Sequence, residues 1–470
     1  MKFVNRIEEL TYVQQAIQSK KNECILVYGK RRVGKTSLLL EILKKQEGFY
    51  YMAQRLPRVQ QLAQFSQQAG AYLKDTFIAE RGFSSWKQAF ERLLKEGKTI
   101  TVVLDEFPYL VESDKNIAIE FQYILDHLFH SRATTTGQGK IKLIVAGSSM
   151  SMMQRLALEY QSPLYGRKTG ILHVLPMSYQ PLKEYFGVKK FDDLLNIYSL
   201  CGGIPLYWEQ YDRKKSFWEN VAAMTLTKNA LLKDEVEFLI QEELREPAIY
   251  FSLLSSIAFG AHKLSEIIAR SGLQKGTITQ YLSNLQRLHF IRREVPFGHH
   301  PEKSKSGLYF LEEHFIQFWF RYIFPHRDVL AEGRVAEMVK LIQKDFSLFQ
   351  SGVYEQMIKT ILQSQEDTLG FRLMGARRFW SKDVEIDMVG VDDERGIISF
   401  VEAKHSRKLV GSAVLHHLQE QSQFVGYLSA KNYAQKFILC STSGFTRELI
   451  DNAKRDKQIV LVRGDKILMV

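Results

Sequence analysis

The chain has 470 residues, of which 45% are apolar and 25% charged, proportions that exclude a disordered chain and leave room for two to four domains. Lys and Arg number 64 against 52 Asp and Glu; this surplus favours a polyanionic partner, nucleic acid before an anionic membrane surface, although it also serves solubility alone. The three cysteines, Cys24, Cys201 and Cys440, lie far apart, which excludes a zinc finger and argues against a secreted disulfide framework.

The sequence contains no segment suited to secretion or to a membrane. The N-terminal residues turn polar within the first six positions, before the apolar core of a signal peptide begins. Among the longest apolar runs is 316–324, which Gln317 and Arg321 interrupt and which is too short to span a bilayer. We therefore expect a cytoplasmic protein with no membrane partner.

Short apolar runs alternate with helical patterns in the first half of the chain, which predicts a parallel α/β sheet. The predicted strands are 24–28, 49–52, 100–104, 142–146 and 171–174. Their richness in Val, Ile, Leu and aromatic residues is typical of strands covered on both faces.

The loop after the first predicted strand matches the phosphate-binding pattern G-x-x-x-x-G-K-[ST]. Its glycines let backbone N–H groups surround phosphate oxygens at the start of a helix. Lys35 is expected to reach the β- and γ-phosphates of ATP, and Thr36 to ligate Mg²⁺. The predicted nucleotide-binding residues of this loop are Gly29, Arg31, Arg32, Val33, Gly34, Lys35, Thr36 and Ser37.

Polar residues follow two further predicted strands. Asp105 and Glu106 come directly after 100–104; an aspartate there can hold Mg²⁺ through water, and Glu106 is placed to activate the attacking water. Ser148 follows 142–146 and is a candidate partner of the γ-phosphate, with a plain turn as the alternative. Arg167 precedes 171–174 and is a candidate for stabilising charge on the γ-phosphate, with a surface ion pair as the alternative.

These motifs, in this order, resemble those of prokaryotic STAND-type ATPases, also called archaeal-type ATPases. The opening F-x-x-R-x-x-E-L at 3–10, the two arginines inside the phosphate loop and the G-x-P motif at 203–205 recur there. The resemblance implies an ATPase core with an added strand between the two nucleotide motifs, followed by a helical lid. It also implies that Arg6 and Pro205 lie near the adenine. Asn5 stands where relatives often carry glycine.

Residues 247–311 show three helical patterns and then two short strands, which predicts a winged helix. The third helical pattern, 274–288, offers polar side chains suited to a DNA major groove: Lys275, Thr277, Gln280 and Asn284. The wing would consist of 291–295 and 308–311, with basic residues near its tip at 299–305. The alternative is a module that contacts only protein.

The last quarter carries acidic residues in a suggestive order. Glu355 lies in a helical pattern, Asp387 in the predicted strand 385–391, and Glu402 and Lys404 at the end of 398–403. A helix at 413–427 and a strand at 437–440 follow. Because alternate strand residues share a face, Glu402 and Lys404 are expected to point the same way.

This helix-strands-helix-strand order with D…E-x-K resembles the PD-(D/E)XK nuclease core, and 309–322 resembles the start of an uncharacterised domain that often follows the ATPase core. Asp387, Glu402 and Glu355 would supply oxygen ligands to Mg²⁺ or Mn²⁺, and Lys404 would activate water. The alternative is a scaffold that has lost activity.

Taken together, the sequence predicts an α/β protein: a P-loop NTPase parallel sheet with a helical lid, a winged helix-turn-helix, and a C-terminal α/β domain like restriction endonucleases. The expected domains are 1–180 (ATPase core), 181–246 (lid), 247–312 (winged helix), 313–349 (helical connector) and 350–470 (nuclease-like). The expected function is an ATP-hydrolysing, Mg²⁺-dependent switch that drives a nuclease-like effector on nucleic acid, DNA rather than RNA. The alternative is a non-cutting, ATP-dependent DNA-binding regulator or scaffold. Either form is compatible with an oligomer.

Overall fold

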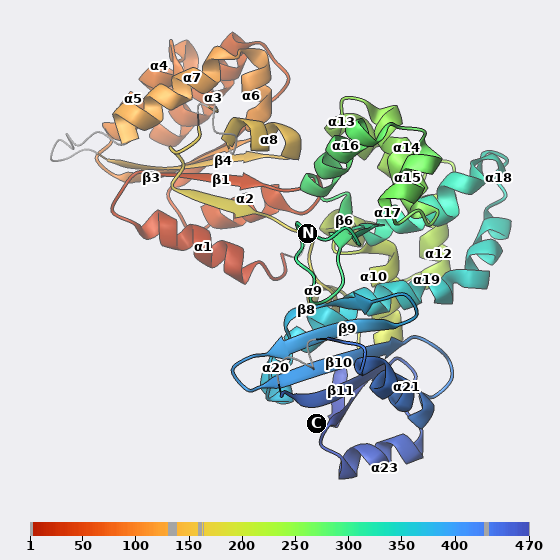
Figure 1. Cartoon of the computed structure of the whole chain (residues 1–470). Helices are drawn as coiled ribbons and strands as arrows, with labels where there is room; N and C mark the ends of the chain where they lie inside the picture. Colours follow the sequence, from red (N-terminus) through yellow and green to blue (C-terminus); the bar gives the residue numbers. More distant parts are fainter. Residues whose placement is uncertain (1–2, 130–138, 158–161, 163, 427–431, 470) are drawn as a thin grey trace. The chain divides into compact units, whose positions relative to one another are not determined.

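The computed structural model describes residues 3–129, 139–157, 162, 164–426 and 432–469. The chain forms two compact units, and Figure 1 colours the ribbon by position in the sequence. The first contains Met1–Met177, Ile204–Glu209 and Glu242–Leu244, and the second contains Ser178–Gly203, Gln210–Gln241 and Arg245–Val470. The finer five-part division expected from the sequence stays a prediction.

The described part of the first unit is built on a five-stranded parallel sheet, which confirms the expected α/β architecture. The order β2-β3-β4-β1-β5 places β4 between the strand before the phosphate loop and the strand that ends in Asp105, as the resemblance implied. Parallel strands bring their carboxyl ends to one edge, so the loops after β1, β3 and β4 meet there. The strands are β1 (Glu23–Tyr28), β2 (Gly48–Met52), β3 (Thr99–Asp105), β4 (Lys140–Gly147) and β5 (Gly170–His173).

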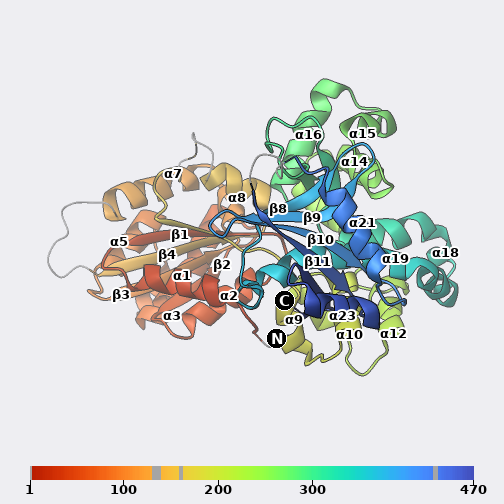
Figure 2. The ribbon, with the colours of Figure 1, turned by 60° about the horizontal axis from the view of Figure 1, so that its bottom comes forward.

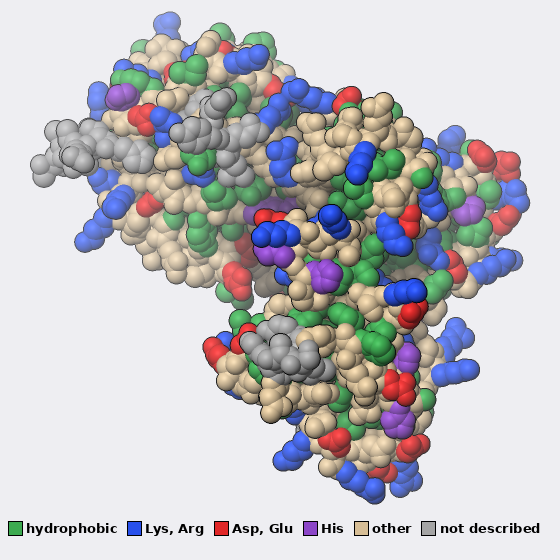
Figure 3. Space-filling model, viewed as in Figure 1, with side chains coloured by type: hydrophobic (Ala, Val, Ile, Leu, Met, Phe, Trp, Pro, Cys, Tyr) green, Lys and Arg blue, Asp and Glu red, His purple; other side chains and the backbone are tan. Residues whose placement is uncertain are grey.

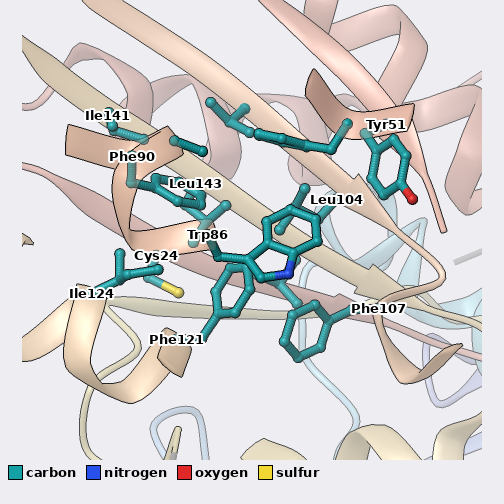
Figure 4. Close-up of a cluster of buried hydrophobic side chains, with 14 of the residues drawn as sticks. Cys24, Tyr51, Trp86, Phe90, Leu104, Phe107, Phe121, Ile124, Ile141 and Leu143 are labelled. Carbon is teal, nitrogen blue, oxygen red and sulfur yellow. The ribbon is translucent and has the colours of Figure 1, made fainter. Parts of the chain in front are cut away.

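Helices cover both faces of this sheet (Figure 1). Side chains of α3, α5, α6 and α7 share a buried cluster with one face, while α1 and α2 lie on the other. In Figure 4 Trp86 lies at the centre of this cluster, and its ring is 4.8 Å from that of Phe65 and 5.5 Å from that of Phe121. The helices are α1 (Ile7–Gln18), α2 (Lys35–Leu43), α3 (Arg58–Leu73), α4 (Thr76–Arg81), α5 (Trp86–Leu94), α6 (Phe107–Ser113), α7 (Asn116–Tyr123), α8 (Met150–Ala157) and α11 (Pro205–Gln210).

The second unit begins with helices and then adds two sheets. Helices α14, α15 and α16 precede a two-stranded antiparallel sheet, β6 (Ile291–Glu294) and β7 (Leu308–Leu311), close to the expected positions. The helices of this unit are α9 (Gln180–Phe186), α10 (Phe191–Cys201), α12 (Phe217–Val221), α13 (Glu235–Glu243), α14 (Pro247–Ala258), α15 (Leu264–Ser271), α16 (Lys275–Arg287), α17 (His314–Phe318), α18 (Arg327–Ala331), α19 (Val335–Gln363), α20 (Glu366–Leu369), α21 (Ser412–Ser422) and α23 (Arg447–Arg455).

A separate mixed sheet forms the C-terminal part of the described chain, and Figure 2 shows β8 to β11 side by side. Its order is β13-β12-β11-β10-β9-β8, parallel from β10 to β12 and antiparallel elsewhere. Three of these strands, β8, β12 and β13, had no counterpart among the predicted elements. The strands are β8 (Met374–Trp380), β9 (Glu385–Asp392), β10 (Ile397–Lys404), β11 (Ala434–Ser441), β12 (Ile459–Arg463) and β13 (Lys466–Met469).

One helix crosses an expected domain boundary. Helix α19 is continuous over 29 residues, Val335–Gln363, so the boundary expected at 349/350 falls inside it. Its buried residues recur along the helix from Met338 to Leu362 and are apolar except for Gln350, which donates to Asn196 at 2.8 Å, and this mostly apolar stripe continues across the expected boundary. None of the helices in the described chain combines the length and the apolar character needed to cross a bilayer.

Acid stability should depend on His314, a buried histidine of α17 that is 8% exposed and packs edge-on against Tyr198 of α10. Burial, aided by the positive charge of Arg292, lowers its pKa from the ordinary 6.5 to about 3. The folded state therefore binds fewer protons than the unfolded state below pH 6.5, so acidification favours unfolding by up to about 1.4 kcal/mol per pH unit from this group.

The test is urea unfolding at pH 5 and pH 7.5 for the wild type and His314→Gln, which keeps a polar side chain but cannot be protonated. We expect the variant to lose less stability than the wild type between the two pH values. Equal losses in both proteins would contradict the prediction.

Candidate nucleotide site and carboxylate cluster

The phosphate-binding loop runs from the end of β1 to the start of α2. Gly34 adopts a φ of 91° and Arg32 one of 69°, so the loop uses left-handed backbone at two positions. A Cβ at Gly29 would lie 2.2 Å from the carbonyl oxygen of Val174, which leaves room only for glycine. The buried side chain of Val33 anchors the middle of the loop. Backbone sterics thus account for the glycines of the motif.

Lys35 lies at the first position of α2 and is 4% exposed. Its Nζ donates hydrogen bonds to the carbonyl oxygens of Gly29 and Lys30, at 2.8 and 2.7 Å. Burial lowers its pKa to about 8, and the carboxylates of Glu106, Asp105 and Glu243 oppose that shift. The ammonium group is therefore held inside the loop, where phosphate oxygens would meet it.

Thr36 and Asp105 come together from α2 and the tip of β3. The Thr36 hydroxyl donates to Asp105 Oδ2 at 2.9 Å, and Asp105 is 1% exposed. A hydroxyl beside a buried carboxylate at the end of a phosphate loop is a donor set that suits Mg²⁺. The two residues thus fit the predicted metal in chemistry and in proximity.

The same carboxylate has a partner that the sequence analysis missed. Tyr50 of β2 donates its hydroxyl to Asp105 Oδ2 at 2.7 Å. Burial and the charge of Asp105 raise the pKa of Tyr50, so the phenol remains a donor. The available signal was its position near the end of a predicted strand, at the edge where phosphate-binding loops gather.

Glu106 and Ser148 are also brought together, from the tips of β3 and β4. The Ser148 hydroxyl donates to Glu106 Oε1, and its backbone N–H donates to Oε2 at 3.2 Å. Glu106 itself has a φ of 52°, an uncommon backbone for a residue with a side chain. The serine thus holds the predicted water-activating carboxylate in a fixed orientation.

Arg6 and Pro205, distant in sequence, both lie against the phosphate loop. The Arg6 guanidinium donates to the carbonyl oxygen of Val33 at 2.8 Å and pairs with Glu9 at 2.6 Å. A Cβ at Gly34 would lie 3.7 Å from Pro205 Cγ. Asn5, where relatives often carry glycine, has a φ of 58°, and Asn tolerates this left-handed backbone better than most residues.

Arg167 shows the alternative that the sequence left open. Its Nε donates to Asp126 Oδ1 at 2.7 Å, and one terminal nitrogen donates to the carbonyl oxygen of Tyr165 at 3.3 Å. A role for Arg167 at the γ-phosphate stays a prediction.

The acidic residues of the C-terminal domain converge pairwise, from α19, β9 and β10. Asp387 Oδ2 accepts the backbone N–H of Ala403 at 2.7 Å, and Lys404 Nζ donates to Glu402 Oε1. Burial, with the nearby charge of Asp387, raises the pKa of Glu355 to about 7 and also raises the pKa of Glu402. Although burial works against it, the charges of Glu402, Asp387 and Glu355 raise the pKa of Lys404. One exposed cationic side chain, Lys404, thus interacts with three half-buried carboxylates.

These carboxylates fit a hard divalent cation in charge and chemistry. Within the ranges that the structure describes, however, no group of three or more Asp, Glu, His or Cys side chains is gathered closely enough to hold a metal ion. The carboxylates therefore interact two at a time, and the role of Glu355, Asp387 and Glu402 as metal ligands stays a prediction.

Two family models match separate parts of the chain. Residues 3–210 match an ATPase domain found predominantly in Archaea. Residues 319–417 match a domain of archaeal and bacterial proteins of unknown function, DUF234. The second match includes Glu355, Asp387, Glu402 and Lys404.

The chain is similar to known proteins in sequence and in fold. The uncharacterized protein MJECL04 of Methanocaldococcus jannaschii is 34% identical over 404 residues, which cover 86% of this chain and 87% of that protein. The uncharacterized ATP-binding protein MJ0423 of the same organism is 42% identical over 45 residues, 10% of this chain and 76% of that protein. The solved structure of the Walker-type ATPase paby2304 of Pyrococcus abyssi has a TM-score of 0.50 at 21% identity, covering 68% of this chain and 96% of that one; it shows the fold alone.

Proposed function

This chain belongs to the archaeal-type family of P-loop ATPases, and on that premise we propose that it couples ATP hydrolysis to an effector domain that cleaves nucleic acid. The observation that carries the effector half of the proposal is the electrostatic interaction among Glu355, Asp387, Glu402 and Lys404, which come from three elements of one domain. Half-buried carboxyl groups with raised pKa values beside a lysine are typical of a functional site.

Different residues of the nucleotide site would bind the phosphates, hold the metal and activate water. Backbone N–H groups and Lys35 bind the phosphate chain, and Thr36 with Asp105 would hold Mg²⁺. Bound Mg²⁺ would neutralise charge on the phosphates. Glu106, oriented by Ser148, takes the proton of the attacking water or aligns it. Arg6 and Pro205 would border the base, as in the resembling family.

The three-helix unit with its two strands supports the winged-helix proposal. Lys275, Thr277 and Gln280 of α16 are exposed, as the DNA-facing prediction requires. Asn284 corrects that prediction: it is half-buried and donates to the Tyr250 hydroxyl at 2.6 Å, because its position turns toward α14. The remaining exposed residues still suit a phosphate backbone.

The wing is attached to the C-terminal sheet. The backbone N–H of Phe297 donates to the carbonyl oxygen of Arg378 in β8 at 2.9 Å, and the Phe297 ring lies in the buried cluster of that sheet. Arg377 donates to the carbonyl oxygen of His299 at 3.4 Å. The wing therefore serves partly as a protein contact, while Lys303 and Lys305 near its tip are exposed.

In the proposed cleavage, Lys404 would orient or activate the attacking water, and Glu355, Asp387 and Glu402 would hold a divalent cation that stabilises charge on the phosphate. The competing function is a non-cutting regulator whose C-terminal domain only binds. The pairwise arrangement of the carboxylates favours it, as does the use of the wing as a protein contact.

A cleavage assay decides between the two. Full-length protein is incubated with duplex DNA, single-stranded DNA and duplex RNA, with Mg²⁺ or Mn²⁺, and with ATP, ADP or neither. Cleavage that EDTA abolishes supports the effector enzyme. Binding without cleavage under every nucleotide and metal condition establishes the regulator.

Nucleic-acid binding should be electrostatic. Lys and Arg side chains are spread over the face in Figure 3 with Asp and Glu among them, so no single patch there marks the contact. We expect the triple variant Lys275→Ala, Lys303→Ala, Lys305→Ala to bind duplex DNA more weakly. The slope of log affinity against log salt should become shallower by roughly 2 to 3, because a protein that contacts fewer phosphates releases fewer counterions on binding.

The affinity for duplex DNA is measured by fluorescence anisotropy at salt concentrations from about 50 to about 300 mM. A matched control replaces three exposed lysines of the ATPase unit, Lys20, Lys95 and Lys115. Equal slopes in the two triple variants would place the contact elsewhere.

A further inference from the structure

A short acidic segment from far along the chain packs with the ATPase unit. Glu242–Leu244 belongs to the first compact unit, although the residues on either side of it belong to the second. Glu242 and Glu243 are the last two residues of α13. The segment lies roughly two hundred residues from the phosphate loop in sequence, so no local motif predicts that the two are in contact.

Both glutamates act on cationic residues of the phosphate loop. Arg31 Nη1 forms an ion pair with Glu242 Oε2 at 3.1 Å, and the same guanidinium donates to the Tyr109 hydroxyl at 3.4 Å. Glu243 interacts electrostatically with Arg31 and with Lys35. A phosphate chain bound in the loop must compete with Glu242 for Arg31 and must tolerate the charge of Glu243.

Glu243 is also tied to the strand tip that orients the catalytic carboxylate. Backbone N–H groups of Ser151 and Met150, at the start of α8, interact with its carboxylate. Ser148, whose hydroxyl donates to Glu106, lies two residues before the start of α8. One of the two carboxylate oxygens, Oε2, is buried without a hydrogen-bond partner among the described residues. Burial raises the pKa of this carboxyl group to about 7. At pH values above that, Glu243 places a negative charge close to the phosphate loop with little solvent to screen it.

We propose that Glu242 and Glu243 make the nucleotide site discriminate by phosphate charge, so that they oppose the triphosphate more than the diphosphate. The physical reason is that ATP brings an additional negative charge to the region where these two carboxylates already compensate Arg31 and Lys35, and like charges at short range in a partly buried site repel. Release of the ATP γ-phosphate relieves that repulsion.

The experiment compares two ligands in three variants. Affinities for ADP and for the non-hydrolysable analogue AMP-PNP are measured with Mg²⁺ by isothermal titration for the wild type, Glu243→Gln and Glu242→Gln. Gln keeps the shape and the acceptor oxygen but removes the charge. We expect Glu243→Gln to lower the dissociation constant of AMP-PNP relative to that of ADP by about tenfold. Glu242→Gln should change this ratio in the same direction.

The matched control is Glu237→Gln, the same change on the same helix at a residue that pairs with Arg327. An unchanged ratio in Glu243→Gln would overturn the proposal. Equal weakening of both ligands would also overturn it, because it would assign the glutamates a structural role. An equal shift in Glu237→Gln would show a general charge effect and would likewise overturn it.

Discussion

Lys35→Ala should lower ATP turnover by about 100-fold or more and weaken nucleotide binding, because it removes the one buried ammonium group of the phosphate loop that can meet the β- and γ-phosphates. The loss falls on the transition state more than on the ground state, since charge on the phosphates is greatest there. Phosphate release reports turnover, and isothermal titration with AMP-PNP and Mg²⁺ reports affinity.

Glu106→Gln separates binding from chemistry. The amide can still accept from Ser148 but cannot take a proton, so we expect near wild-type affinity with turnover lower by about 100-fold or more. Thermal unfolding of both variants checks that the fold survives, because Lys35 also bonds two loop carbonyl oxygens. Wild-type affinity and turnover in Lys35→Ala would contradict the assignment of the nucleotide site.

Asp387→Ala should reduce metal-dependent cleavage to background. Burial, and after it the charge of Asp387, raises the pKa of both Glu355 and Glu402, so Asp387 interacts with both of the other carboxylates. Without it the remaining carboxylates repel less, while the backbone N–H of Ala403 loses its acceptor. The two effects oppose each other, so the fold should survive. The affinity of the remaining carboxylates for a divalent cation should fall, since a ligand is lost. Cleavage of labelled DNA with Mn²⁺ and Mn²⁺ binding by calorimetry are the two readouts.

Lys404→Ala should behave differently. The lysine acts on water rather than on the cation, so we expect Mn²⁺ binding to persist or to strengthen while cleavage is lost. Glu385→Gln is the matched control: it lies on the same strand as Asp387, is exposed and pairs with Arg378. Equal activity of Asp387→Ala and Glu385→Gln would remove the nuclease proposal and leave the regulator.

The nucleotide site could be predicted because its parts are contiguous or nearly so. Residues 29–36 specify their own backbone through glycine and place Lys35 and Thr36 at a helix start, so the pattern alone identifies the chemistry. Asp105, Glu106 and Ser148 followed from a general property of parallel sheets, whose carboxyl ends share one edge. The apolar runs likewise predicted the five strands of the first sheet within a few residues.

The phosphate loop, the parallel sheet and the E-x-K strand can all be predicted from the amino-acid pattern, since each depends on local periodicity or on a short motif. The three-dimensional fold was needed to find the distant residues that complete the sites: Tyr50 on Asp105, Glu242 on Arg31, and Phe297 of the wing on β8. These contacts join residues separated by tens to hundreds of positions, and their side chains also suit ordinary surfaces and cores. Their positions follow from how helices and strands pack, and a pattern read along one chain carries no record of that packing.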